Sequence, residues 1–129
     1  MEALTPPRTS ADHAAITATA RDYFEGWFDG DVDRMDRALH PDLVKRQVGS
    51  ELGITSKERM LELTRRGEGA QDASDRTLEI EVEDVFGDIA SATVHSAVYH
   101  EYIHLVRTRA GWQIANTLWQ FTAEADGGA

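Results

Sequence analysis

The segment YHEYIHLVRT, residues 99–108, concentrates proton-exchanging groups in a short run that also carries apolar side chains. Five of its first six side chains are titratable, namely Tyr99, His100, Glu101, Tyr102 and His104. The apolar residues among and after them are typical of a β-strand. Histidine has an unperturbed pKa of about 6.5, so it can act as an acid or a base near neutral pH. The segment is therefore either the wall of a polar pocket or a strand that faces water.

Hydrophobic periodicity predicts the helices that must position this strand. Apolar side chains at helical spacing predict a long amphipathic helix over residues 10–30, and its buried face is rich in aromatic residues: Ile16, Ala20, Tyr23, Phe24, Trp27 and Phe28. Gly30 is expected to end it. A shorter helix is expected over residues 31–39 and a third over residues 55–66, with a short extended segment at 42–48 between them.

Alternating residues predict a sheet in the second half of the chain. The expected antiparallel strands are residues 76–86, 89–98, 101–108 and 112–121. In the first of them, apolar side chains alternate with the acidic residues Glu79, Glu81 and Glu83. Helices followed by strands predict an α+β fold, a cone in which a strongly curved antiparallel sheet holds three helices in its concavity. We expect one domain over residues 1–129, with loosely ordered ends at residues 1–9 and 123–129.

Composition narrows the classes of partner. The 129 residues carry a net charge of −10, which argues against a nucleic-acid partner because such binding needs basic patches. The chain has no cysteine, so it has neither a disulfide framework nor a thiolate metal site. No signal peptide and no run long enough to cross a membrane are visible, so we expect a cytoplasmic protein without a membrane partner.

Motifs for metals and cofactors are missing from the sequence. His100 and His104 are four residues apart, a metal-ligand spacing on a helix, but on a strand they lie about 13 Å apart. No two histidines are two residues apart, and His95 is expected on the outer face of the sheet. The chain also lacks a glycine-rich phosphate loop and a G-x-S-x-G motif. We therefore predict no bound metal and no cofactor.

Two longer stretches carry a resemblance to a known family. YFEGWFDGDVDRMDRALHPDLVKR, residues 23–46, and YIHLVRTRAGWQIANTLW, residues 102–119, resemble the NTF2-like superfamily. More narrowly, they resemble the branch described as "putative lumazine-binding" or SnoaL-like proteins, over most of the chain from Ala14 to Phe121. The resemblance implies the α+β cone, an internal pocket and a homodimer formed through the sheet. The superfamily contains ketosteroid isomerases, dehydratases, polyketide cyclases and simple binding modules, so the resemblance leaves function open.

The resemblance to ketosteroid isomerases implies where catalytic groups lie. Their oxyanion-stabilising acid is on the strand before the last, which corresponds to His104 and implies that Tyr102 and His104 point into the pocket. The position of their catalytic carboxylate corresponds to Arg46 in this chain. The chain departs from the isomerase pattern here, because a guanidinium cannot accept a proton. Arg46 with Lys45 would favour an anionic or enolate ligand. The alternatives are that Tyr102 and His104 are satisfied core groups, and that both cations pair with the Glu-rich strand.

These considerations give one hypothesis with two alternatives. We expect a cofactor-independent acid–base enzyme of isomerase, dehydratase or cyclase type, acting on a small cyclic or aromatic carbonyl compound through His104, Tyr102 and Arg46. The ligand contacts are expected to be Tyr23, Trp27, His40, Lys45, Met60, His100 and Trp119, although His40 could simply cap the short helix. The alternatives are a non-catalytic protein that binds a flat hydrophobic or heterocyclic molecule, and a structural dimer. The homodimer would use an outer sheet face formed by Trp112, Ile114, Asn116 and Leu118.

Overall fold

The secondary structure follows the predicted order with two short additions. A computed structural model describes residues 10–49, 53–72 and 75–122, so the ends predicted to be loosely ordered lie outside the described residues. The helices are α1 (Ser10–Asp29), α2 (Val32–Ala38), α3 (Lys57–Arg65) and the short 3-10 helix η1 (Glu68–Asp72). The strands are β1 (Leu39–Gln47), β2 (Gly53–Thr55), β3 (Leu78–Phe86), β4 (Ile89–Ser96), β5 (Tyr99–Thr108) and β6 (Gly111–Phe121). The additions are β2 and η1.

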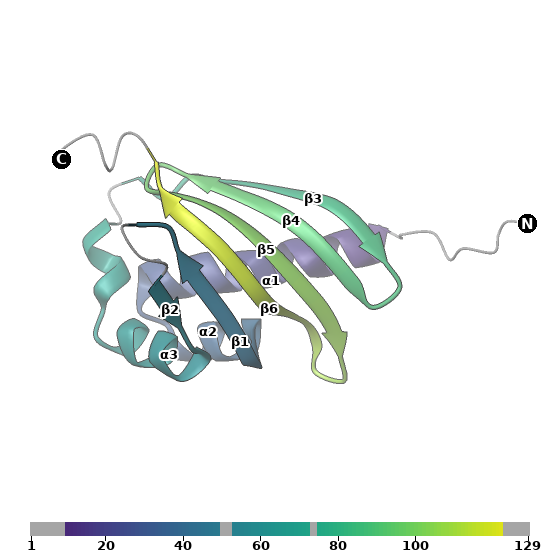
Figure 1. The fold of residues 1–129 in the computed structure, drawn as a ribbon, viewed down its shortest axis with the longest axis horizontal. Coiled ribbons are helices and arrows are strands. Elements are labelled where there is room, and N and C mark those ends of the chain that lie inside the picture. The colour runs from purple at the N-terminus through teal and green to yellow at the C-terminus, as the bar shows by residue number, and fades with distance from the viewer. Residues whose placement is uncertain (1–9, 50–52, 73–74, 123–129) are drawn as a thin grey trace, which may run out of the picture.

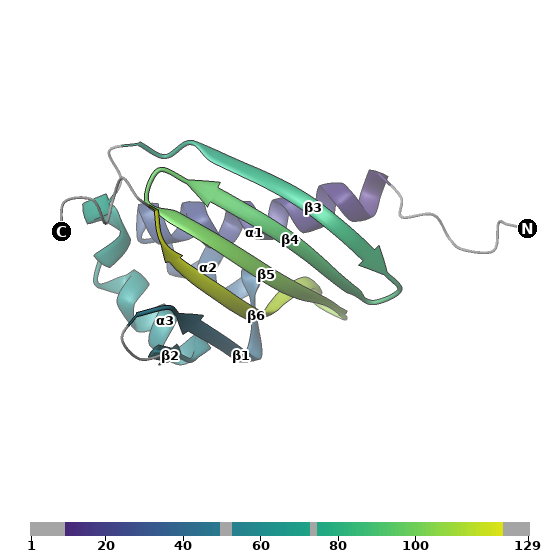
Figure 2. The same ribbon diagram turned by 45° about the horizontal axis from the view of Figure 1, so that its top comes forward.

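The strands form one curved sheet with the helices on one side. Its strand order is β2-β1-β6-β5-β4-β3, and every neighbouring pair is antiparallel except β1 with β6, which is parallel. Figures 1 and 2 show α1 crossing behind the long strands, while α2 and α3 lie towards the β1 end. The predicted α+β cone is confirmed. We call the sheet face towards α1 the inner face and the opposite one the outer face.

Helix α1 presents the predicted aromatic stripe to the inner face. Its buried side chains are Ile16, Ala20, Tyr23, Phe24 and Phe28, and Trp27 is half-buried against them. The helix ends at Asp29 because Gly30 adopts φ +68°, a left-handed conformation that favours glycine. Asp31 then begins α2, since its side chain accepts a hydrogen bond from the Arg34 backbone N–H. Within α1, Tyr23 and Trp27 reach β5 by hydrogen bonds to Glu101 and Tyr99.

Strand β5 buries its odd-numbered residues in its first seven positions. The buried side chains are Tyr99, Glu101, Ile103 and Leu105, whereas Tyr102 and His104 are exposed. Side chains alternate between the faces of a sheet, so Ile103 and Leu105, which lie in the core cluster, fix the direction of Glu101 as well. The inner face of β5 therefore carries a carboxylic acid within an otherwise apolar and aromatic row.

Strand β6 contains a β-bulge that changes its parity. His104 pairs with Asn116 and Leu105 pairs with Ile114, which leaves Ala115 as the extra residue. Side chains on both sides of the bulge consequently point to the inner face, including the buried Trp112, Ile114 and Thr117. The prediction that Trp112 and Ile114 lie on the outer face is wrong, because strict alternation fails at the bulge. Asn116 and Leu118 do lie on the outer face and are exposed.

None of the helices in the described ranges combines the length and the apolar character that crossing a membrane requires.

The direction of β5 can be tested by a pair of substitutions at neighbouring positions. Ile103 is fully buried, so Ile103→Ala should lower the free energy of unfolding by about 2–5 kcal/mol through lost burial and a residual cavity. Tyr102 is 52 % exposed, so Tyr102→Ala should change it by less than about 1 kcal/mol. Guanidinium unfolding of both variants measures these values, and a larger loss for Tyr102→Ala would show that the strand faces the other way.

Candidate functional site

A pocket of about 300 Å³ opens between the helices and the inner face of the sheet. Its walls come from α1, β1, β2, α3, η1, β5 and β6. Most of the lining is apolar or aromatic, and within it Lys45 of β1 lies next to Glu101 of β5. The lining residues are Tyr23, Phe24, Trp27, Lys45, Gln47, Thr55, Met60, Leu63, Glu68, Tyr99, Glu101, Trp119 and Phe121.

Three side chains form a linked polar group at one wall of this pocket. The Tyr23 hydroxyl donates a hydrogen bond of 2.6 Å to Oε2 of Glu101 and accepts one from the Lys45 ammonium. Lys45 Nζ lies 3.7 Å from the same carboxylate oxygen. Only 1 % of Glu101 is exposed, so its charge is taken out of water and is compensated by Lys45 and by the tyrosine hydroxyl. We call Tyr23, Lys45 and Glu101 the polar triad.

Burial shifts the proton affinities of the triad in opposite directions. The pKa of Tyr23 is raised well above its ordinary value, first by burial and then by the neighbouring Glu101 carboxylate, both of which disfavour the phenolate. Burial lowers the pKa of Lys45, although attraction to Glu101 opposes this shift. Tyr23 is therefore a neutral hydrogen-bond donor over the physiological range, and Lys45 gives up its proton more readily than an exposed lysine.

Aromatic rings surround the triad and exclude water from it. The indole N–H of Trp27 donates a hydrogen bond of 2.9 Å to the hydroxyl of Tyr99, which ties α1 to β5. The rings of Tyr99 and Trp119 meet edge to face at 5.2 Å. Lys45 Nζ lies 5.2 Å from the ring centre of Trp119, so this ring stabilises its positive charge, while the Tyr23 hydroxyl accepts its hydrogen bond.

The 3-10 helix η1 holds Trp27 in place from outside. A Cβ atom at Gly69 would lie 2.3 Å from the Trp27 carbonyl oxygen and 2.6 Å from its indole ring, so only glycine permits this approach. Met60 of α3, which is buried, and Leu63 complete the apolar wall near this helix. The pocket is thus shaped partly by η1, which lies between the expected third helix and the first long strand, where no helix or strand is predicted from the sequence.

Five of the expected ligand contacts do line the pocket, and two lie elsewhere. Those in the lining are Tyr23, Trp27, Lys45, Met60 and Trp119. The side chain of His40 instead accepts a hydrogen bond of 3.0 Å at Nδ1 from the Asp42 backbone N–H. His100 lies on the outer face of β5 beside His95.

The expected direction of the proposed catalytic groups is wrong. Tyr102 and His104 are exposed on the outer face, since the buried Ile103 between them turns both away from the helices. Arg46 is exposed and pairs in register with Leu118, so it also points outwards, whereas its neighbour Lys45 points inwards. Any participation of these three residues in chemistry stays a prediction, but as placed they lie outside the inner pocket.

Glu101 is the residue of the site that sequence reasoning missed. If Tyr102 and His104 point inwards, as the resemblance to ketosteroid isomerases implies, Glu101, Ile103 and Leu105 lie on the outer face, and the structure places these three on the inner face instead. The apolar character of Ile103 and Leu105 was the available signal, as it favours burial of that side of the strand. That signal predicts that Glu101 is buried, and a buried carboxylate needs a compensating cation or hydrogen-bond donor.

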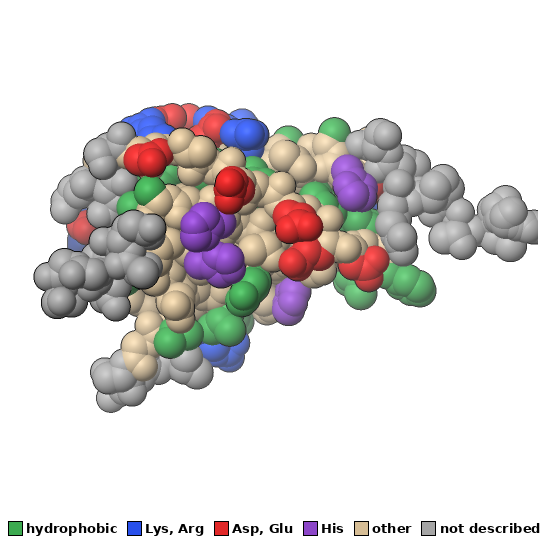
Figure 3. Space-filling model, turned by 90° about the horizontal axis from the view of Figure 1, so that it is seen from above, with side chains coloured by type: hydrophobic (Ala, Val, Ile, Leu, Met, Phe, Trp, Pro, Cys, Tyr) green, Lys and Arg blue, Asp and Glu red, His purple; other side chains and the backbone are tan. Residues whose placement is uncertain are grey.

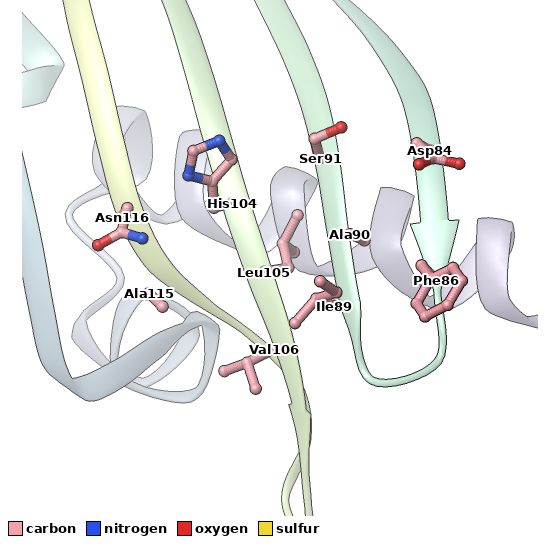
Figure 4. Close-up of a pocket in the computed structure, with 10 residues that line it drawn as sticks. All are labelled: Asp84, Phe86, Ile89, Ala90, Ser91, His104, Leu105, Val106, Ala115 and Asn116. Atoms are coloured by element: carbon pink, nitrogen blue, oxygen red, sulfur yellow. The ribbon is translucent and has the colours of Figure 1, made fainter.

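The outer face carries a second, shallower hollow and a histidine pair. A space of about 380 Å³ lies beside His104, Ser91 and Asn116, which Figure 4 shows on neighbouring strands. Nδ1 of His95 lies 2.9 Å from Nδ1 of His100, and Figure 3 shows two adjoining histidines on the surface near acidic side chains. Within the described ranges no three His, Asp or Glu side chains are grouped so as to hold a metal ion.

Large apolar side chains are also exposed on this face. They include Phe86, Ile89, Tyr102 and Leu118. A homodimer through this outer face stays a prediction. Of the four residues expected at its interface, Asn116 and Leu118 point outwards.

Comparison with known proteins relates residues 11–120 to one family and most of the chain to one fold. Residues 11–120 match the protein family described as "Putative lumazine-binding". A separate match covers 55 residues, 43 % of the chain, at 42 % identity to a curated Arabidopsis thaliana protein described as "Putative beta-glucosidase 5". That match spans 10 % of the length of the plant protein.

Solved structures of similar shape share the arrangement of helices and sheet. An NTF2-like protein from Silicibacter pomeroyi superimposes with a TM-score of 0.69 at 18 % identity, covering 88 % of this chain and 99 % of that one. One from Shewanella baltica has a TM-score of 0.70 at 14 % identity, with coverage of 88 % and 97 %. A ketosteroid isomerase-like protein from Erwinia carotovora atroseptica has a TM-score of 0.60 at 17 % identity, with coverage of 88 % and 98 %.

The raised pKa of Tyr23 predicts how stability depends on alkaline pH. The unfolded chain loses the Tyr23 proton near the ordinary pKa of 10.0, whereas the folded chain retains it. The folded state then binds more protons, so the stabilisation from Tyr23 is complete below that pH and declines as the pH rises above it. The free energy of unfolding should therefore fall more steeply between about pH 9 and 11 in the wild type than in Tyr23→Phe. Equal slopes would contradict the burial of this hydroxyl beside Glu101.

The coupling between Lys45 and Glu101 can be measured with a double-mutant cycle. Lys45→Met leaves a buried carboxylate without its cation and should lower the free energy of unfolding by about 3–5 kcal/mol at pH 7. Adding Glu101→Gln removes the uncompensated charge, so the double variant should regain part of that loss. Lys57→Met is the matched control, because Lys57 pairs with Asp36, whose side chain is 58 % exposed, and a smaller loss is expected there. Additive losses for Lys45→Met and Glu101→Gln would show that the two residues are not coupled.

Proposed function

The chain belongs to the NTF2-like family described as "Putative lumazine-binding", and from this premise we propose that it is a cofactor-independent acid–base enzyme acting in the inner pocket. The proposed substrate is a small, flat, cyclic or aromatic carbonyl compound. The reaction type is proton transfer, as in an isomerase, dehydratase or cyclase. We assign the catalytic roles to the polar triad rather than to His104, Tyr102 and Arg46.

One observation carries this proposal: a carboxylate, a phenol and an amine are hydrogen-bonded in series at the wall of an aromatic pocket. Glu101 supplies a base for a C–H or O–H proton of the bound compound. Tyr23 supplies a neutral donor that can turn from Glu101 to a developing oxyanion on the substrate. Lys45 holds a positive charge beside both, which favours negative charge on the substrate oxygen.

The walls of the pocket support the shape of the proposed substrate. Trp27, Tyr99 and Trp119 offer extended ring surfaces, and such surfaces suit a flat conjugated molecule. The descriptive name of the family refers to lumazine, a flat heterocycle, which supports the same shape class. It does not select a particular compound for this chain.

A second function, ligand binding without catalysis, is supported by the hydrogen bonds that the triad residues make to one another. The Tyr23 hydroxyl already donates to Glu101 and accepts from Lys45, so this hydroxyl is satisfied without a ligand. A protein that only binds a flat hydrophobic or heterocyclic molecule would gain stability from such a closed arrangement and would need no turnover. The two functions differ in whether Glu101 moves a proton.

Exchange of carbon-bound hydrogen separates these two functions without knowledge of the natural substrate. The probe is 2-tetralone, a flat cyclic ketone, whose α-hydrogens exchange with D₂O when a base removes them. For an enzyme, the wild type should accelerate exchange and Glu101→Gln should lower the protein-dependent rate by about 100-fold or more, since the catalytic base is lost. Exchange is followed by NMR, and binding is followed by quenching of tryptophan fluorescence.

Two control variants make the result specific to the inner pocket. Glu79→Gln changes an exposed glutamate of β3, and His104→Ala changes the exposed histidine of β5, so both should leave exchange unchanged. Quenching without exchange in the wild type would favour the binding protein. Loss of exchange in His104→Ala with retention in Glu101→Gln would move the chemistry to the outer face and overturn the proposal.

A further inference from the structure

Lysine is rare in this chain, and its two copies have different environments. Lys45 and Lys57 are the only lysines of the 129 residues, among eleven arginines. The ammonium of Lys57 is held by the Leu39 carbonyl at 2.9 Å and by the Asp36 carboxylate at 3.1 Å. The ammonium of Lys45 lies at the wall of the inner pocket. An arginine at this position could not act as a nucleophile, because its guanidinium stays protonated.

The neighbours of Lys45 provide a route by which its ammonium can lose a proton inside the pocket. Lys45 donates to the Tyr23 hydroxyl, and that hydroxyl donates to Glu101 at 2.6 Å. A proton passing along this chain converts the ammonium and carboxylate into a neutral amine and a neutral carboxylic acid. Burial lowers the pKa of Lys45 because the ammonium is taken out of water, and this favours loss of its proton.

We propose that the Lys45 amine forms an imine with an aldehyde or ketone bound in the inner pocket. This inference rests on the proposed function and adds a covalent intermediate to it. The amine lone pair attacks the carbonyl carbon, and the C=O π electrons move to oxygen, which takes a proton from the Tyr23–Glu101 chain to give a carbinolamine. The attacking nitrogen, which carries two protons at this stage, passes one of them to the carbinolamine hydroxyl. The C–O bond then breaks and releases water while the nitrogen lone pair forms the C=N bond. In sum, a lysine ammonium and a carbonyl compound give a protonated imine and one water, with the positive charge conserved.

The surroundings of Lys45 suit such a product. The protonated imine retains the positive charge where the ring of Trp119 already lies 5.2 Å from the nitrogen. Glu101, 3.7 Å from that nitrogen, regains its proton-accepting form next to the carbon atoms that the imine makes acidic. The same carboxylate thus serves in forming the imine and in the proton transfer that follows.

Reductive trapping tests this proposal directly. The full chain is incubated with 2-naphthaldehyde, which is flat and has no α-hydrogen, in the presence of sodium cyanoborohydride, which reduces imines to stable secondary amines. Intact mass and peptide mapping then locate the adduct among Lys45, Lys57 and the α-amino group. We expect the adduct on Lys45, with a labelling rate at least about tenfold above that of Lys57, because the Lys45 amine faces the pocket whereas the Lys57 ammonium is held by the Leu39 carbonyl and the Asp36 carboxylate. The labelling should be lost in Lys45→Arg, which keeps the charge, and retained in Lys57→Arg.

The remaining variants and readouts separate this inference from the proposed function. Tyr23→Phe interrupts the proton route and should slow labelling of Lys45 by about tenfold, while circular dichroism confirms that the variant is folded. If tryptophan fluorescence shows the aldehyde in the pocket but the adduct appears only on Lys57 or the α-amino group, the imine is overturned. If Glu101-dependent exchange of 2-tetralone also persists in that case, the acid–base function stands without the imine. Absence of quenching, exchange and adduct overturns both.

Discussion

A carboxylate buried on β5 imposes the main constraint on this protein. Glu101 is 1 % exposed, and an isolated charge at that depth would oppose folding strongly. Its compensation comes from Tyr23 on α1 and Lys45 on β1, both distant in sequence. The three elements are therefore held in one relative position by a polar contact as well as by apolar packing. The parallel pairing of β1 with β6 places Lys45 next to Thr117, which brings the amine over the inner face.

The aromatic shell determines what this polar contact can do. Rings of Trp27, Tyr99 and Trp119 surround the triad on the pocket side and keep its electrostatic interactions strong by excluding water. In water the same amine and carboxylate would behave as an ordinary surface pair. Inside the shell, transfer of a proton between them converts two charged groups into two neutral ones without changing the net charge of the pocket, and this is the property on which a proton-transfer or imine chemistry depends.

The outer face of the sheet differs from the inner face in its chemical character. It carries glutamates, histidines and exposed apolar residues, and the side chains of Tyr102 and His104 stand on it rather than over the pocket. The hollow beside His104 and the contact between His95 and His100 arise from the pairing of β4 with β5. One strand thus supplies two chemically distinct surfaces, because residues that alternate in sequence are separated by the thickness of the sheet.

Much of the fold was determined by the sequence alone. The aromatic stripe of α1, its end at Gly30 and the alternation of β3 all rely on local periodicity and on the conformational freedom of glycine, and the structure confirms them. The inward direction of Tyr23 and Trp27, which line the pocket, was predictable for the same reason. Tertiary structure alone decided where the bulge at Ala115 reverses the parity of β6 and that η1 packs on Trp27. It also decided that Glu101, Tyr23 and Lys45 meet, since their contact depends on strand register and helix docking across up to 78 residues of chain, which local patterns do not encode.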